Sequence, residues 1–579
     1  MEQERKASPA PESVTHSAPR RIRPIAGKFV LIAALAGALL GGLTVAHRFA
    51  FAAPEPEEIP PIPAMFQGWT TPDFVLFVSG QTHGYLQPCG CSRPQMGGLV
   101  RRYNFMEWLK REKKWTVVPV DFGEIIADKS ANERQTAIKF ETNMKALEVM
   151  GYAAYGLGET EVKFGLLNAL IATSNIDLKR PIPLALNLDQ ASKKGETYFD
   201  LNVRQYVVVD TPKIKVGITS VVGPTVAASD PAVKFNNNGQ IIPPGLAAMK
   251  KDKAEFVVMM YQGKDKEAGL CAKFCADVAK KQPPAAAAAV PVHLMIHAAE
   301  EEEPPGALTP IGSTSLLTMG HKGRYVGVVG VWKNAMGGFD TKYQLVPMGE
   351  EWITPNAKIA GHPVMKLMET EFAERVAKQG LANLFPRNSH ITQLQLQAKD
   401  VNAKYIGSAA CANCHPFADQ VWAKTGHAHA FQTLVDAKNP GHREKDGECI
   451  VCHTVGFMNH TGYLDKANTP KMNAKLIDVG CESCHGPGSM HANDPDNKDY
   501  YKFMNAFAKH HNPNLPEKSR MQRLDDFCQK CHDIDNDVNW GKVPFEKKWA
   551  KIAHPTPKAG AQPAVQGKDK DAPPKIVEK

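Results

Sequence analysis

Residues 481–485 read Cys-Glu-Ser-Cys-His, and the same Cys-x-x-Cys-His pattern occurs three more times after residue 410. Two thiols three residues apart reach the two vinyl groups of one porphyrin, and the histidine that follows binds the iron as its proximal ligand. A zinc site or a disulfide framework would not need a histidine after every second cysteine. The pattern therefore predicts four covalently bound haem c groups. Their motifs, numbered first to fourth, are Cys411, Cys414 and His415; Cys449, Cys452 and His453; Cys481, Cys484 and His485; and Cys528, Cys531 and His532.

The composition of the whole chain excludes several classes of protein. Of its 579 residues 43% are hydrophobic and 22% are charged, which excludes a polytopic membrane protein and a wholly disordered chain. The net charge of +9 is spread along the sequence without a basic patch, so we expect no nucleic-acid partner. A chain of this length predicts about three or four domains.

The N-terminal segment carries the signals of export. Residues 1–28 are polar and basic, and residues 29–46 form a run of 18 residues without a charge. This pattern predicts a signal anchor or a signal peptide within residues 29–50, with Ala50-Phe51-Ala52 as the candidate cleavage site. The basic flank stays inside, and the remainder lies on the periplasmic side of the membrane or is released there. Residues 51–70 read as a proline-rich linker.

Short apolar strands alternate with amphipathic helices over residues 71–350, which predicts an α/β sandwich. The expected strands are 74–79, 116–121, 153–157, 206–209, 215–221, 255–260, 292–296 and 325–331. The expected helices are 99–111, 131–150 and 266–281.

The C-terminal part of the chain has a different character. Residues 351–400 predict a helical connector, and residues 555–579 predict a disordered tail. Residues 401–554 have few strand or helix patterns and many Gly, Asn, Asp and His residues. Such a segment cannot bury enough apolar surface alone. We expect a mainly α, loop-rich tetrahaem domain in which covalently held haems complete the core.

Each haem iron has a sixth coordination position. A second histidine there gives a low-spin haem that transfers electrons, whereas a vacant position leaves a haem that binds a small molecule. Spacing alone does not assign a histidine to an iron. Beyond the four proximal ligands, the candidates are His427, His429, His442, His460, His491, His510, His511 and His554.

Residues 404–554 resemble the multihaem cytochromes of nitrifying bacteria, of the c-554 type. The resemblance rests on Tyr405-Ile406-Gly407-Ser408, on residues 422–429 (WAKTGHAH), on residues 484–491 (CHGPGSMH) and on residues 549–554 (WAKIAH). It implies four haems stacked in close pairs, most of them with two histidine ligands and one of them five-coordinate.

The same resemblance suggests individual distal ligands. It implies that His427, His491 and His554 are distal ligands, with His429 as a second choice beside His427. No histidine matches for the second motif, so the resemblance implies an open haem at His453. His442 and His460 are close in sequence and remain alternatives that could close it.

Residues 71–350 are similar to the metallophosphoesterase domain of 5′-nucleotidases. The cues, in order, are Gln81-Thr82-His83-Gly84, Gly97-Gly98-Leu99, Asp121-Phe122-Gly123-Glu124, Gly158-Glu159-Thr160-Glu161 and Ile296-His297-Ala298-Ala299. In that family these loops hold two metal ions that activate a water molecule for attack on a phosphate ester.

Most of the family's ligand positions are altered in this chain, although His83 and His297 are retained. Gln81 and Glu124 stand where the family has aspartates, Glu159 stands for asparagine, and Thr160 and Ala299 stand for histidines. Glutamine and alanine cannot replace a bridging carboxylate or an imidazole. We therefore expect a catalytically inactive domain that serves as a scaffold or docking surface for the haem domain.

Four further cysteines lie outside the haem motifs, at positions 89, 91, 271 and 275. An oxidising compartment favours disulfides among them. Cys271 and Cys275 lie one helical turn apart, which is poor geometry for a bridge, so a bridge from that helix to Cys89 or Cys91 is the better prediction. A soft-metal site at Cys89 and Cys91, or buried free thiols at Cys271 and Cys275, are the alternatives.

These observations predict an electron carrier more than an enzyme. The expected function is a multihaem c-type cytochrome that passes electrons between periplasmic or membrane redox partners, such as donor and acceptor cytochromes or a quinol-linked complex. One alternative is a redox enzyme acting on a small nitrogen-oxide-type molecule at an open haem. Another is a phosphoesterase or nucleotide-binding protein tethered to a cytochrome, with metal bound at His83 and His297.

Overall fold

The computed structural model describes residues 59–88, 93–127, 131–176, 178–189, 201–280, 289–298, 303–355, 358–504 and 514–554. The predicted N-terminal signal or anchor and the C-terminal tail lie outside these residues, as do Cys89, Cys91, Ala299, His510 and His511. Among the described residues, no helix combines the length and the apolar character that crossing a bilayer requires.

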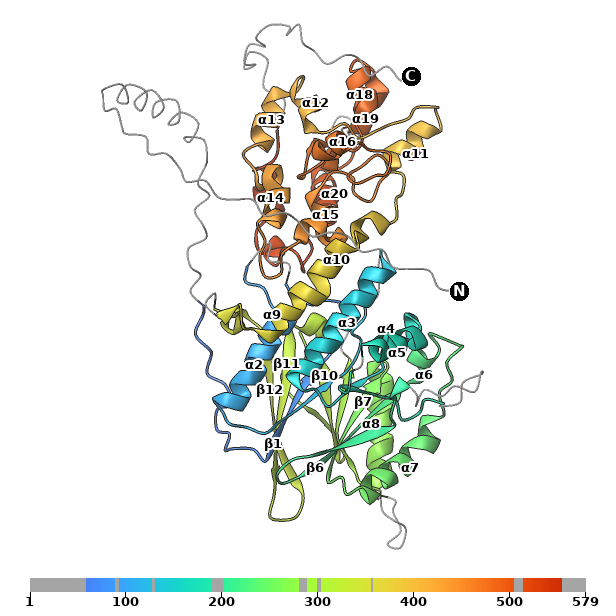
Figure 1. Ribbon diagram of the computed structural model, residues 1–579, viewed down its shortest axis with the longest axis vertical. Coiled ribbons are helices and arrows are strands. Elements are labelled where there is room, and N and C mark those ends of the chain that lie inside the picture. Colours follow the sequence, from blue (N-terminus) through green and yellow to red (C-terminus); the bar gives the residue numbers. More distant parts are fainter. Residues whose placement is uncertain are drawn as a thin grey trace, which may run out of the picture. The chain divides into compact units, whose positions relative to one another are not determined.

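Two six-stranded mixed sheets form the N-terminal α/β domain (Figure 1). In the first sheet the strand order is β12-β11-β1-β2-β3-β4, with β1 to β4 parallel and β11 antiparallel to both β1 and β12. Its strands are β1 (Phe74–Ser79), β2 (Val117–Asp121), β3 (Ala154–Gly156), β4 (Ile182–Leu184), β11 (Tyr325–Lys333) and β12 (Phe339–Pro347).

The second sheet has the order β5-β6-β7-β8-β10-β9, in which β6, β7, β8 and β10 are parallel and the two edge strands are antiparallel to their neighbours. Its strands are β5 (Tyr206–Asp210), β6 (Lys215–Val222), β7 (Phe256–Gln262), β8 (Val292–Ala298), β9 (Thr309–Ile311) and β10 (Thr314–Met319).

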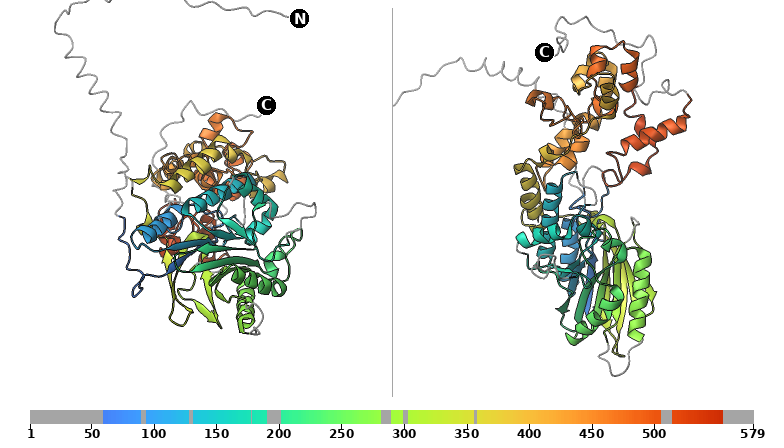
Figure 2. Two further views of the ribbon diagram at one scale, coloured as in Figure 1. Left: turned by 60° about the horizontal axis from the view of Figure 1, so that its bottom comes forward. Right: turned by 90° about the vertical axis from the view of Figure 1, so that its right-hand side faces the viewer.

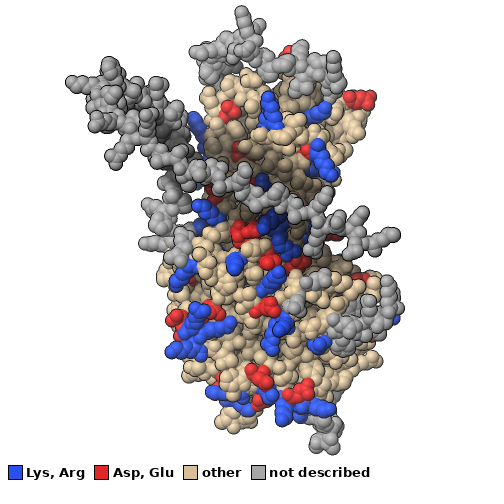
Figure 3. Space-filling view, in the orientation of Figure 1, with Lys and Arg blue, Asp and Glu red and all other residues tan. Residues whose placement is uncertain are grey.

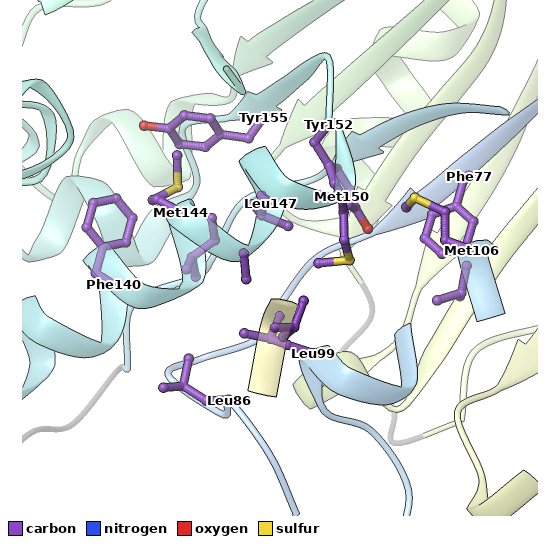
Figure 4. Packing of buried hydrophobic residues seen from close by; sticks show 14 of the residues in the cluster. Phe77, Leu86, Leu99, Met106, Phe140, Met144, Leu147, Met150, Tyr152 and Tyr155 are labelled. Carbon is purple, nitrogen blue, oxygen red and sulfur yellow. The ribbon is translucent and has the colours of Figure 1, made fainter. Parts of the chain in front are cut away.

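The alternation of side chains along β1 explains how the layers stack. Phe74, Leu76 and Val78 face the second sheet and pack with residues of β6, β7 and β8. Val75 and Phe77 point the opposite way, into a core shared with helices α2 (Leu99–Arg111) and α3 (Glu133–Met150). Successive residues of a strand point to opposite faces of the sheet. Because every residue of β1 is buried, other elements must cover both faces of the sheet at this strand. Figure 4 shows the core between the first sheet and its helices.

Helices cover the outer face of the second sheet as well. Helices α7 (Asn238–Lys251) and α8 (Asp265–Lys280) pack there around Leu246, Met249, Ala272 and Cys275. In Figure 2, α2 and α3 lie on one side of the two sheets and the green helices of this region lie on the other. The structure thus confirms the predicted α/β sandwich and shows that it has four layers.

Two segments outside the predicted domain belong to its core. Phe66 and Trp69, from the predicted linker, pack against Trp115 with ring centroids 5.0 and 5.8 Å away. From the predicted connector, the continuous helical stretch α9 (Pro363–Leu367), η5 (Met368–Ala373) and α10 (Glu374–Lys378) adds apolar residues to the core between the first sheet, α2 and α3. The first part of the connector, up to Leu381, is therefore packed on the α/β domain, whereas Phe385 and Leu396 pack with residues of the C-terminal region.

The remaining residues form the haem domain, which is built from short helices. The four motifs lie on α12 (Ser408–Ala412) and the turn that follows it, on α15 (Gly447–His453), on α17 (Cys481–His485), and at the end of α20 (Glu517–Cys528) with its following turn. Other short helices include α13 (Pro416–Trp422), α14 (Ala430–Val435), α18 (Ser489–Asn493), α19 (Lys498–Met504) and α21 (Phe545–Trp549). The described part of residues 401–554 contains isolated bridges but no strand.

Candidate functional site: three histidine pairs and a fourth motif histidine

Three of the predicted proximal histidines lie close to a second histidine, with similar distances between the ring centroids. The ring centroids lie 6.2 Å apart for His415 and His491. They lie 6.0 Å apart for His427 and His532, and 5.9 Å apart for His485 and His554. Two imidazole rings that bind one iron, each through a bond of about 2 Å, have centroids about 6 Å apart. The three gaps therefore fit a haem iron between each pair of rings.

The short helices after the motifs explain how the distal members reach these positions. His491 lies on α18, which follows the third motif after Gly486, Pro487 and Gly488. His427 lies in the 3₁₀ turn Gly426–His429, and His554 follows α21. Each distal histidine thus comes from the neighbourhood of a different motif from the one that it faces, which is why sequence spacing does not reveal the pairs.

Hydrogen bonds at Nδ1 orient several of these rings. His453 Nδ1 is paired with the carbonyl of Ala430, and His485 Nδ1 with the carbonyl of Met504. His532 Nδ1 lies 3.1 Å from Asp537 Oδ2. A hydrogen bond of this kind fixes the ring orientation and leaves Nε2 as the ligand nitrogen. Burial lowers the pKa of His485 and of His453, which favours the neutral imidazole that binds a metal.

His453, in the second motif, is different from the other three proximal histidines. Among the described residues, no other histidine ring lies in ring-contact range of it. The two alternatives from the sequence have other neighbours: His442 Nε2 lies 3.7 Å from Glu369 Oε1, and His460 Nδ1 lies 3.8 Å from Asp465 Oδ2. Burial raises the pKa of Asp478, and both His429, the second choice beside His427, and His453 lie near enough to oppose that shift.

Cysteines of different motifs lie close together. Cys411 lies beside Cys481, Cys531 lies beside Cys452, and Cys484 lies near Cys528 and Cys531. The third motif is therefore close to both the first and the fourth, and the second motif is close to the fourth. Haems attached at these positions would lie near one another.

A buried carboxylate holds the third motif in place. Glu482 is 1% exposed, and its carboxylate accepts hydrogen bonds from the backbone N–H groups of Ile406, Gly407 and Gly488. Burial raises the pKa of Glu482 to about 7, although these hydrogen bonds oppose the shift. The residue ties together the segments before the first motif and after the third, and the sequence offered no signal for this role.

In the α/β domain, the predicted metal-ligand positions are occupied by hydrogen bonds between side chains. Gln81 Nε2 donates to Glu124 Oε2 at 3.0 Å, and His83 Nε2 lies 3.6 Å from the same oxygen. The ring of His321, a residue outside the predicted metal-ligand loops, has its centroid 5.3 Å from that of His83. Gln81, His83 and Glu124 have φ values of 49°, 45° and 55°, a left-handed conformation that is uncommon outside glycine.

The other predicted positions do not complete a metal site. Both ring nitrogens of His297 are engaged, with Nδ1 3.1 Å from Asp265 Oδ1 and Nε2 2.9 Å from Thr318 Oγ1. Glu159 pairs with Lys163 at 2.8 Å, and Thr160 is buried. Within the described residues no group of three or more His, Cys, Asp or Glu side chains is arranged to hold a metal ion.

The predicted disulfide from α8 is not present. Cys271 and Cys275 are free, buried thiols that pack in the core between α8 and the second sheet. The sequence-based prediction of a bridge at these residues was wrong because α8 turns this face inward, where both side chains fill apolar space beside Ala268 and Ala272. The alternative prediction, that Cys271 and Cys275 are buried free thiols, is confirmed.

Comparisons with known proteins distinguish the two halves of the chain. Residues 410–486 match the family described as cytochrome c554 and c-prime. The chain is 28% identical to cytochrome c-554 of Nitrosomonas europaea over 177 residues, which span 29% of this chain and 71% of that protein. The C-terminal part of this chain is thus similar to cytochromes of the c-554 type.

Solved structures resemble the α/β domain in fold. The 5′-nucleotidase precursor of Thermus thermophilus matches 55% of this chain at 16% identity, with a TM-score of 0.42. The 5′-nucleotidase of Candida albicans matches 53% of it at 13% identity, with a TM-score of 0.40. The chain spans 60% and 58% of the lengths of these two proteins.

Proposed function

We propose that this protein is a tetrahaem c-type cytochrome that passes electrons between redox partners on the periplasmic side of the membrane. The observation that carries the proposal is the set of three facing histidine pairs, each with a gap that suits an iron. Proximal ligands would be His415, His453, His485 and His532, and distal ligands would be His491, His554 and His427. Haem c, when bound, supplies one-electron redox chemistry. The chain supplies the axial ligands, buries the haems and fixes their arrangement.

Under this proposal the haem of the second motif is open, because His453 lacks a facing histidine among the described residues. The other three haems would be low-spin carriers. An open iron beside the carriers also favours, as a second candidate, a redox enzyme acting on a small nitrogen-oxide-type molecule. The electron-carrier function requires no bound substrate and is the simpler conclusion. Export would depend on the predicted signal or anchor within residues 29–50.

The α/β domain would act as a scaffold in this function. Its predicted metal site holds the Gln81–Glu124 hydrogen bond instead of a complete ligand set. The loop that carries His321 also carries Lys322 and Arg324, and both form ion pairs with Asp535, three residues after the fourth motif's histidine. The surface around the altered site is thus in contact with the haem domain.

Haem counting tests the proposal. Intact-mass measurement of the full-length holoprotein should give four covalent haems, and a C449A/C452A variant should lose one of them. A C271A/C275A variant is the matched control. It also removes two cysteines, but these lie outside the four haem motifs, so the variant should keep all four haems. Fewer than four haems in the unmodified protein, or no loss in C449A/C452A, would contradict the proposal.

A further inference from the structure

Helix α3 of the α/β domain contacts the segment that carries the second motif. Gln135 and Lys139 are four residues apart and therefore lie on one face of α3. Gln135 Nε2 donates a hydrogen bond of 2.7 Å to Asp446 Oδ1, and Lys139 Nζ forms an ion pair with Glu448. The Lys139 side chain is 13% exposed, so water screens its charge poorly.

These contacts are made at the first residues of the motif helix. Asp446 is the N-cap of α15, and its side chain accepts a hydrogen bond of 2.9 Å from the backbone N–H of Glu448. Its backbone carbonyl accepts from the N–H groups of Cys449 and Ile450. A cap of this kind sets the start and direction of a helix. Through Asp446, α3 therefore sets the position of the cysteines and histidine that follow.

The connector holds the same segment from a second side. Glu369 Oε2 accepts a hydrogen bond of 2.8 Å from the backbone N–H of Gly441. Phe385 packs so closely on Gly447 that an added Cβ atom would lie 2.2 Å from its ring. The segment 441–448 is thus fixed on both flanks before the first cysteine of the second motif.

We propose that Gln135 and Lys139 are positioning residues for the haem of the second motif, and that the buried charge of Lys139 raises the reduction potential of that haem. The proposal rests on the proposed function, which assigns a haem to Cys449, Cys452 and His453. Reduction adds one electron to the iron, supplied by a neighbouring haem or by an external reductant, and no bond is made or broken. A fixed positive charge nearby favours the form with the additional electron.

The test is a potentiometric titration of the full-length holoprotein, followed at the haem signal that the C449A/C452A variant lacks. In Lys139→Met, this signal should titrate at a more negative potential than in the unmodified protein, while the other haems keep theirs. Lys139→Arg should retain the original potential. Glu448→Gln should move the same haem in the positive direction, because it removes the opposing negative charge.

Lys145→Met is the matched control. Lys145 lies on the same helix and pairs with Glu371 of the connector at 2.8 Å, away from the motif. This variant should leave the potential of the second motif's haem unchanged. The proposal is overturned if Lys139→Met shifts no haem, or if Lys145→Met shifts this haem equally. Failure of the underlying function has a different signature, since the peptide containing residues 449–453 would then carry no haem mass in the unmodified protein.

Discussion

Phe77 in β1 and Ile450 in α15 are both inaccessible to solvent, but they belong to cores of very different size. Phe77 is one of many buried apolar residues in a continuous core shared by the first sheet and its helices. Ile450 shares its cluster with four other buried residues, Ala382, Phe385, Leu434 and Phe457. The α/β domain is stabilised by its own side chains, whereas the C-terminal domain has only small apolar clusters around its motifs.

The two regions also differ in the side chains found at their predicted metal sites. In the α/β domain, Gln81 and Glu124 form a hydrogen bond at the predicted metal position. In the C-terminal domain, three pairs of histidine rings have centroids about 6 Å apart. On the face in Figure 3, acidic and basic side chains are intermixed over the α/β domain. The comparison suggests that one region supplies a rigid support and the other supplies the redox centres.

The largest expected effect is the loss of haem. Protein produced without haem attachment should keep a folded α/β domain, while residues 401–554 should lose their structure because the small clusters cannot offset the chain entropy. Limited proteolysis followed by mass spectrometry measures this difference. A haem-free protein that resists proteolysis equally in both regions would contradict the comparison.

The next largest effect is expected from the removal of one distal ligand. His491→Ala should convert one haem from low spin to high spin, because His415 then has no facing ring. Optical and EPR spectra of the oxidised holoprotein measure the change. His460→Ala is the control, since His460 is 56% exposed and lies beside Asp465. If His491→Ala leaves all low-spin signals intact, the pairing of His415 with His491 is wrong.

A change in the large core should affect only the α/β domain. Phe77→Ala removes a fully buried ring, and we expect a loss of about 3–5 kcal/mol in the free energy of unfolding of that domain. Denaturant titration followed by tryptophan fluorescence measures the loss. The haem spectra should stay unchanged below the unfolding transition, and a spectral change in native buffer would show that the two cores are not independent.

The smallest effect is a pH dependence of the same domain. Burial lowers the pKa of His293 from 6.5 to about 4, and its Nδ1 accepts a hydrogen bond from the backbone N–H of Val257. Below pH 6.5 the unfolded chain binds a proton that the folded domain does not. The free energy of unfolding should therefore fall by up to about 3 kcal/mol between pH 6.5 and pH 4.

His293→Asn is the matched variant for this dependence. Asparagine keeps an acceptor near the position of Nδ1 but does not titrate, so the variant should lose less stability than the unmodified protein over the same pH range. Denaturant titrations at several pH values provide the measurement. Equal pH dependence in both proteins would exclude His293 as its source.

The sequence predicted the α/β elements well where periodicity was strong. The structure confirms β1 over Phe74–Ser79 and α2 over Leu99–Arg111, both with the expected bounds. Helix α7 was missed because Pro243 and Pro244 lie within it, which is an unfavourable signal for a helix. Strand β12 was missed because most of its side chains are partly or fully exposed, and a weak apolar alternation gives little signal.

The candidate site was only partly accessible to sequence reasoning. Covalent chemistry fixes the spacing of each motif, so the proximal histidines could be named from local sequence. The distal partner proposed for His532, His427, comes from a distant segment, and it is the packing of the short helices that brings the two together. No local sequence pattern marks the roles proposed for Gln135 and Lys139. A polar helix face that contacts another domain has the same residue pattern as a face exposed to solvent.

The most direct test of the account is a low-temperature EPR spectrum of the oxidised full-length holoprotein, quantified before and after the addition of nitric oxide. The account predicts three low-spin ferric haems, together with one high-spin haem whose signal nitric oxide removes. Four low-spin haems that do not respond to nitric oxide would contradict it, because the haem at His453 would then have a sixth protein ligand.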